Sequence, residues 1–232
     1  MKLRTSNQRN RALTLTEALV VIGVLAIVVA LLLPGLAAAK RGPQKINCVS
    51  NLKQIGIAYR LWEGDNNFKY PMAVSVTNGG AMELIATGNV AACFQVMSNE
   101  LSTPKVLLCP EDIRRVRATN FSTLNSSNIS YFVGLDADPS RPQMFLSGDD
   151  NFAINGVPVK SGLLKLSMNI PVAWASGRHR HVAYNSHFWV PARYQFFGNL
   201  GMADGCVQQV TTDFLQKALQ QTGVATNRLV LP

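Results

Sequence analysis

The organisation of this 232-residue chain is decided by residues 13–33, which read LTLTEALVVIGVLAIVVALLL. The stretch holds one charged residue, Glu17, and every residue after Glu17 is apolar or glycine. As a helix that rises about 1.5 Å per residue, it would span roughly 31 Å, close to the thickness of a bilayer core. A helix is the one single segment that satisfies its own backbone in lipid. The stretch therefore predicts a transmembrane helix near the N-terminus.

The charges on either side of this stretch favour a cytoplasmic N-terminus. Residues 1–12 contain four basic residues and no acidic residue. Basic residues are enriched on the cytoplasmic side of membrane helices. Three basic residues, Lys40, Arg41 and Lys45, follow the stretch on its other side. Because the difference is only four against three, charge alone does not fix the orientation.

Two common kinds of N-terminal segment remain as alternatives. A secretory signal peptide also has a basic start and an apolar run, and Ala37 and Ala39 would supply its small-residue cleavage site. A plain signal anchor would hold a domain outside the cytoplasm. Glu17 argues against both, because a carboxylate inside the membrane costs about 3 kcal/mol and calls for a partner.

Residues 12–17, which read ALTLTE, resemble the type IV prepilin processing motif. In that family a small residue precedes the cut, an apolar residue follows it, and a Glu is fifth in the mature chain. The resemblance implies cleavage between Ala12 and Leu13, N-methylation of Leu13, and an assembly role for Glu17. Pro34 is twenty-second, where many pilins carry a helix-kinking proline. The chain departs from the family pattern in having Ala12 for the usual Gly and Leu13 for the usual Phe.

The resemblance also implies partners and a mechanism. Prepilin peptidase would remove residues 1–12, a basic prepilin leader, and an inner-membrane platform would assemble the processed chain. Glu17 of one subunit would pair with the Leu13 amine of its neighbour in a homo- or hetero-oligomeric filament of pilins or pseudopilins. Each charge is costly in hydrocarbon, and the pair relieves both. The chain would be a single-pass inner-membrane protein with a periplasmic headgroup, and then part of a filament in the periplasm or at the cell surface.

After the transmembrane and assembly helix, residues 13–34, we expect residues 35–64 to continue as an amphipathic helix. The sequence KRGP at residues 40–43 predicts a break or kink. Beyond it, apolar residues recur at spacings of three and four and form one stripe, on which a globular domain would pack. The stripe is Cys48, Leu52, Ile55, Tyr59 and Trp62.

Residues 46–62, INCVSNLKQIGIAYRLW, resemble pilin-like proteins of planctomycete and verrucomicrobial bacteria. Those proteins are often grouped with type II secretion pseudopilins and carry a C-terminal His-x9-Asp-Gly motif. Asp204 and Gly205 match the end of that motif, but Tyr194 stands where its histidine is expected. The motif in this chain is therefore degenerate.

Residues 65–232 are expected to form an α+β headgroup, with a mostly antiparallel sheet packed on the long N-terminal helix. Asn155-Gly156 and Asp204-Gly205 each predict the turn of a hairpin. The remaining elements follow from apolar runs and turn residues. They are helices at 95–101 and 213–221 and strands at 106–110, 129–135, 144–146 and 228–231.

The four cysteines, Cys48, Cys93, Cys109 and Cys206, contain no CxxC pair, which argues against a zinc site. An even number in an exported chain permits disulfides without requiring them. Cys93–Cys109 is one candidate bridge. Cys48 lies on the predicted apolar stripe and can simply be packed there.

Acidic residues and histidines are the candidate metal ligands of the sequence. Asp136, Asp138, Asp149 and Asp150 supply oxygen ligands of the type that calcium prefers, although their spacing matches no EF-hand and turn formation explains them equally well. His179 and His181 would share one face of a strand, but the arginines beside them would repel a cation. No metal or other cofactor is therefore expected, with calcium as the remaining candidate.

Composition and motifs exclude several classes of function. Charged residues make up 15% of the chain, below the roughly 25% of soluble proteins, and the net charge of +9 forms no basic stripe with interleaved aromatics. We therefore expect no nucleic-acid binding. No catalytic signature is present, so we expect no enzyme. The leading hypothesis is a structural subunit of a type II secretion pseudopilus or type IV pilus. The alternative is a monomeric, signal-anchored periplasmic ligand-binding domain.

Overall fold

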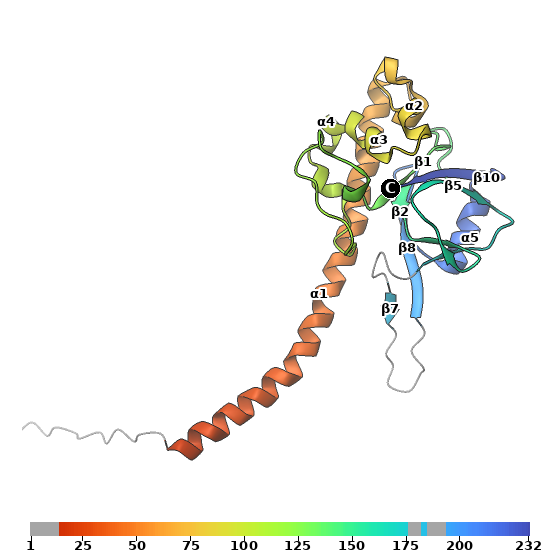
Figure 1. Cartoon of the computed structure of the whole chain (residues 1–232). Helices are drawn as coiled ribbons and strands as arrows, with labels where there is room; N and C mark the ends of the chain where they lie inside the picture. The colour runs from red at the N-terminus through yellow and green to blue at the C-terminus, as the bar shows by residue number, and fades with distance from the viewer. Residues whose placement is uncertain (1–13, 176–181, 185–193) are drawn as a thin grey trace, which may run out of the picture. The chain divides into compact units, whose positions relative to one another are not determined.

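The computed structural model describes residues 14–175, 182–184 and 194–232. It is an α+β structure with two compact units, which divide between Pro43 and Gln44 (Figure 1). Helix α1, Leu15–Asp65, begins in the first unit and ends in the second. The strands and the remaining helices belong to the second unit.

In the first unit, α1 presents an apolar surface. The span Leu15–Leu32 has a mean hydropathy of 2.8, and none of its residues is buried. It is long and apolar enough to cross a membrane, as residues 13–33 predict. A signal sequence would have the same length and composition, so this property does not distinguish between the two.

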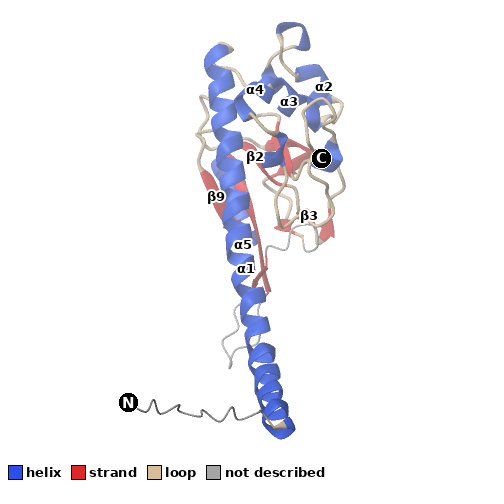
Figure 2. Ribbon diagram, turned by 90° about the vertical axis from the view of Figure 1, so that its left-hand side faces the viewer, coloured by secondary structure: helices blue, strands red, loops and turns tan. Residues whose placement is uncertain are grey.

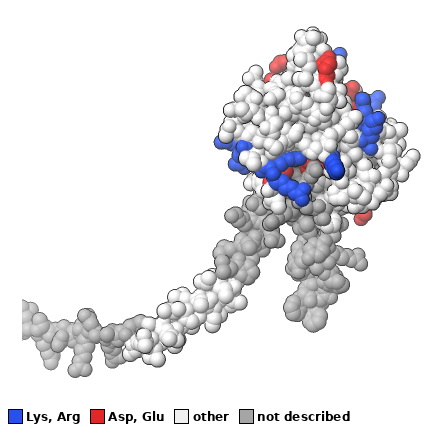
Figure 3. All heavy atoms as spheres, viewed as in Figure 1, with Lys and Arg blue, Asp and Glu red and all other residues white. Residues whose placement is uncertain are grey.

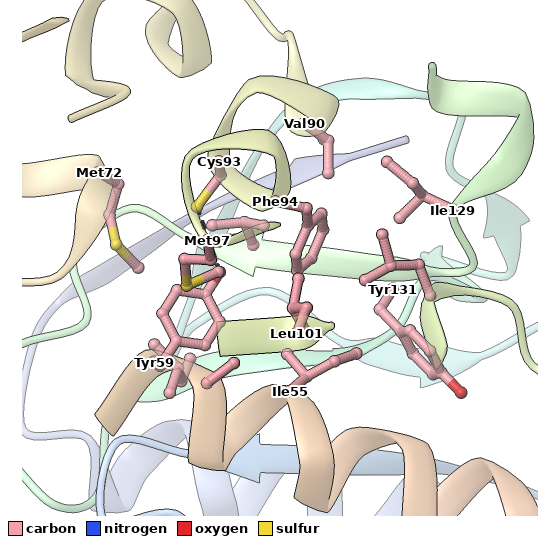
Figure 4. Packing of buried hydrophobic residues seen from close by; sticks show 14 of the residues in the cluster. Ile55, Tyr59, Met72, Val90, Cys93, Phe94, Met97, Leu101, Ile129 and Tyr131 are labelled. Carbon is pink, nitrogen blue, oxygen red and sulfur yellow. Dashed lines mark hydrogen bonds between the residues drawn. The ribbon is translucent and has the colours of Figure 1, made fainter. Parts of the chain in front are cut away.

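In the second unit, one face of α1 is buried in the larger of two hydrophobic cores. All five members of the predicted apolar stripe are buried, which confirms the stripe. Figure 4 shows Ile55 and Tyr59 of α1 directed toward Phe94 and Met97, which belong to α3, Val90–Val96, and to the residue that follows it. The stripe therefore holds the second half of the helix to the head.

The main sheet of the second unit is antiparallel throughout its described pairs. Its order is β5-β10-β1-β2-β8-β7, and β9 also pairs with β8. The strands are β1 Tyr131–Gly134, β2 Phe145–Asp149, β5 Gly162–Ser167, β7 Val182–Tyr184, β8 Tyr194–Met202, β9 Val207–Thr211 and β10 Thr226–Leu231.

The two faces of this sheet line two different cores. Tyr131 and Val133 of β1 join the core that contains α1, whereas Phe132 between them joins the core that contains helix α5, Thr212–Gln221. This is the side-chain alternation expected of a strand that is covered on both faces. Figure 2 shows the second half of α1 running beside the strands. A small sheet, order β4-β3-β6, adds to the α5 side with strands β3 Phe152–Ile154, β4 Val157–Pro158 and β6 Val172–Trp174.

Short helices connect α1 to β1 and complete the larger core. They are α2 Met82–Ala86, α3, α4 Ser98–Leu101 and the 3-10 turns η1 Pro71–Ala73, η2 Val76–Asn78, η3 Pro104–Leu107 and η4 Ser126–Asn128.

The expected hairpins at Asn155-Gly156 and Asp204-Gly205 are present, as are the final helix and the last strand. The predicted helix at 95–101 corresponds to the end of α3 together with α4. The predicted strand at 106–110 is wrong, because η3 occupies Pro104–Leu107. Pro104 begins this turn, and the Thr103 side chain caps it by accepting a bond from the Lys105 N–H.

Residues 40–43 do not interrupt α1, which is helical from Leu15 to Asp65, so the predicted break is wrong and the alternative, a kink at this point, stays a prediction. Pro43 removes one backbone donor, which does not by itself end a long helix.

The candidate Cys93–Cys109 bridge is corrected by the structure, which bonds Cys109 to Cys48. The apolar stripe turns Cys48 inward to within a Cα–Cα distance of 5.0 Å of Cys109, in the range for a disulfide. Cys93 is a buried free thiol with its sulfur 3.3 Å from the Tyr59 hydroxyl, and Cys206 is free and exposed. The disulfide therefore ties α1 to the loop that follows η3.

Candidate functional site

The start of α1 is built around the one carboxylate of its apolar span. The Thr14 backbone N–H and hydroxyl donate to Glu17 Oε2 at 2.8 and 2.7 Å. In return, the Glu17 N–H donates to the Thr14 hydroxyl at 3.3 Å. This reciprocal arrangement is a capping box, in which the first residue and the one three places on satisfy each other's backbone donors. Glu17 is therefore hydrogen-bonded within its own chain at the first turn of the helix.

The surroundings of Glu17 make its remaining hydrogen-bonding capacity important. Ionised carboxylates accept about four hydrogen bonds, and the Thr14 bonds both go to a single oxygen. The side chains that follow on the helix are exposed and apolar, and the only charge among Leu15–Leu32 is that of Glu17. In an apolar medium, this carboxylate could therefore accept further hydrogen bonds from a cationic partner. The span Leu15–Leu32 contains no cation, so the partner would have to come from elsewhere.

The other residues of the expected processing site are placed less fully. Ala12 and Leu13 lie outside the described residues. Pro34 lies within α1. Of the four residues of this set, Glu17 is therefore the one whose side-chain bonds are defined.

Asp204 and Gly205 form the turn between β8 and β9, and this turn lies against α1. Gly205 has a φ of 84°, which favours glycine, and its Cα would lie 3.7 Å from a side chain added at Gly56. Ala203, just before the turn, donates to the Met144 carbonyl at 2.9 Å. Ala203 also accepts a bond from the Tyr70 hydroxyl at 2.8 Å. Gly205 therefore brings the turn of the hairpin close to α1 at Gly56, and Ala203 bonds the start of the turn to Met144 and Tyr70.

Tyr194 lies at the opposite end of β8, where it pairs with Tyr184. At about 3.3 Å per residue, the length of β8 separates Tyr194 from the turn by roughly 25 Å. The three residues of the degenerate motif are therefore not brought together into one site.

The four candidate calcium ligands divide into separate contacts. Asp136 pairs with Arg228, and Asp138 accepts bonds from the backbone and hydroxyl of Ser140.

Asp149 and Asp150 are buried at the end of β2. Asp149 accepts two bonds from Asn199 at 2.8 Å, and Asp150 pairs with Arg115 at 2.7 Å. Within residues 14–175, 182–184 and 194–232, no group of three or more His, Cys, Asp or Glu side chains could hold a metal ion. In this part of the chain, the four aspartates that were candidate calcium ligands therefore do not form one site. His179, His181 and the arginines beside them lie outside the described residues.

No protein-family model, no curated protein and no solved structure matches this chain.

Two parts of the arrangement were not predicted from the sequence. The Thr-x-x-Glu spacing of Thr14 and Glu17 is a sequence signature of a capping box, and it could have identified Thr14 as a partner. The approach of Gly56 to Gly205 joins residues 149 positions apart, for which the sequence alone offers no signal.

Proposed function

We propose that this chain is a pilin-like filament subunit, assembled through its N-terminal helix. The observation that carries the proposal is the position of Glu17, the single charge of the apolar span Leu15–Leu32, at the first turn of α1. Cleavage between Ala12 and Leu13 would create a new amine on Leu13, directly before Thr14 and four positions before Glu17, at the end of the chain where a neighbouring carboxylate has to be neutralised. The head, tied to α1 by the buried stripe and by the Cys48–Cys109 bridge, would be carried along the filament.

The Thr14–Glu17 capping box suggests how an unassembled subunit tolerates its carboxylate. An unpaired charge near the middle of a bilayer costs about 3 kcal/mol, and less toward its boundary. The two bonds from Thr14 offset part of this cost before any neighbour is present. Thr14 is neutral and does not compensate the charge of Glu17. On assembly, the methylated Leu13 amine of the next subunit would supply the positive charge that pairs with this carboxylate. Subunit register would then be set by the pairing of one amine with one carboxylate.

The disulfide supports the proposed location of the head. Disulfides persist in oxidising compartments such as the bacterial periplasm and are rare in the cytosol. A head that holds Cys48 and Cys109 together is suited to the periplasmic side of the inner membrane, with the N-terminus cytoplasmic. Prepilin peptidase and the membrane assembly platform would be its processing and assembly partners.

The proposal is tested by changing Glu17 and comparing three properties of the same cells. In Glu17→Ala, we expect membrane insertion and cleavage to be retained and cross-linked oligomers to fall about tenfold or more, because the neighbouring amine is left without a partner. Thr16→Val, one residue away on the exposed helix surface, is the matched control and should assemble normally. Normal assembly of Glu17→Ala would instead favour the monomeric, signal-anchored ligand-binding domain.

A further inference from the structure

A cavity of about 360 Å³ opens on the second unit. It is built by the loop after η3, by η4, by the residue before β5 and by the end of β10. The residues that line it are Asp112, Arg114, Arg115, Ser126, Ser127, Ser161 and Pro232.

Backbone and side-chain bonds fix these segments against one another. The Val116 N–H donates to the Ser127 carbonyl at 3.2 Å, which joins the arginine loop to η4. The Arg115 guanidinium donates at 3.0 Å to a main-chain oxygen of Pro232, the last residue of the sequence, which joins the loop to the residue after β10. Because Leu231 pairs with Gly162 across β10 and β5, Ser161 is brought to the same place. The cavity is therefore formed by the folded head without further rearrangement.

Arg115 forms a rigid part of the cavity wall. Its side chain is only 10% exposed and pairs with Asp150 at 2.7 Å and with Asp112 at 3.5 Å. The Asp112 carboxylate also accepts bonds from the Ser130 hydroxyl and the Arg114 N–H, so its charge is turned toward these donors. A guanidinium has five N–H donors, and these ion pairs and the Pro232 bond use three of them. Arg115 thus keeps donor capacity while its charge is compensated.

Arg114 supplies the uncompensated charge. Its side chain is exposed, and within the described part of the chain its guanidinium makes no hydrogen bond or ion pair. Lys160 is exposed beside Ser161, and the hydroxyls of Ser126 and Ser161 also have no partner among the described residues. Figure 3 shows several Lys and Arg side chains on the visible face of the head, with a few Asp and Glu side chains among them.

We propose that this cavity binds a phosphate group. Guanidinium groups match phosphate in geometry and charge, and hydroxyls donate to its remaining oxygens. An approaching anion would meet the unpaired guanidinium of Arg114 and the remaining donors of Arg115, while Asp112 and Asp150 are already paired with Arg115. The volume lies at the low end for small-molecule sites, which suits a phosphate on a small molecule or on a lipid headgroup. The proposal does not depend on filament assembly.

Calorimetric titration of the full chain in neutral detergent with inorganic phosphate tests the site directly. We expect saturable binding that Arg114→Gln weakens about tenfold, the effect of losing one charge-assisted hydrogen bond. Ser161→Ala should weaken it about threefold, as loss of one neutral hydrogen bond does. Lys217→Gln, which removes an equal charge from α5, is the matched control and should leave the Kd unchanged.

A second titration distinguishes a free phosphate from a lipid headgroup. Micelles that contain phosphatidylglycerol are mixed with the protein, and the phosphorus resonance of the lipid is followed. If the lipid phosphorus resonance broadens with the unaltered protein but not with Arg114→Gln, and inorganic phosphate binds weakly, the site is supported and its ligand is a lipid headgroup. Arg114-dependent binding of inorganic phosphate supports it with a free ligand. The proposal is overturned if Arg114→Gln matches the unaltered protein with both probes, or if Lys217→Gln weakens binding as much as Arg114→Gln does.

Discussion

The Cys48–Cys109 disulfide should contribute a large share of the stability of the head. It closes a loop with a sequence separation of 61, between the buried face of α1 and the segment after η3. The loop-entropy relation gives about 4 kcal/mol for a loop of this length. The double variant Cys48→Ala, Cys109→Ala should therefore lower the free energy of unfolding by about 4 kcal/mol, against a usual total of about 5–15 kcal/mol.

The assay is denaturant unfolding of the full chain in detergent, followed by tryptophan fluorescence, since Trp62 and Trp174 are both buried. Reduction of the unaltered protein should reproduce the loss seen in the double variant. Cys206→Ala, which removes an exposed cysteine, should stay within about 0.5 kcal/mol of the unaltered protein. A double variant within about 1 kcal/mol of the unaltered protein would refute the reasoning, as would an unfolding curve that reductant does not move.

Two further predictions concern the packing of the head. Gly198→Ala should lower the free energy of unfolding by about 1–3 kcal/mol in the same assay, because the added carbon would lie 2.6 Å from ring atoms of the buried Trp174; an unchanged midpoint would contradict this. Burial raises the pKa of the Cys93 thiol to about 12, so the unfolded state loses this proton first as pH rises above about 9. This thiol should then lower the free energy of unfolding by up to about 1.4 kcal/mol per pH unit between about pH 9 and 12. The measurement is denaturant unfolding at a series of pH values in this range. In a Cys206→Ala background, adding Cys93→Ala should make the free energy of unfolding fall less steeply with pH.

The parts of the fold with a clear period were predicted well. The apolar stripe from Cys48 to Trp62 recurs every three or four residues, and burial of one helix face is the simplest outcome of that pattern. The Asp204-Gly205 turn was found because Gly205 needs a positive φ. Both features depend on residues that are close in sequence.

Short apolar runs and proline positions were less informative. Val106 and Leu107 are buried as a strand there would be, but they belong to a 3-10 turn that begins at Pro104. A short apolar run does not distinguish a buried strand from a buried turn of helix. In the same way, Pro34 and Pro43 each remove one backbone donor from α1 without ending it, so the position of Pro43 did not locate a break.

Contacts between distant residues could not be predicted. Four cysteines allow three ways of forming two bridges, and the sequence does not choose among them, so the partner of Cys109 had to come from the fold. The cavity is lined by residues from Asp112 to Pro232, which the strand order of the sheet brings together. The Thr14–Glu17 capping box is different, because it joins residues that are three positions apart and the Thr-x-x-Glu spacing predicts it. The sequence interpretation assigned these residues to a processing motif alone.

Mass spectrometry of the N-terminus of the protein from its native membranes tests the central claim most directly. The account predicts a chain that begins at Leu13 and carries one methyl group on its amine. A chain that begins at Lys40 would contradict it in favour of a cleaved signal peptide, and an intact Met1 would contradict it in favour of a plain membrane anchor.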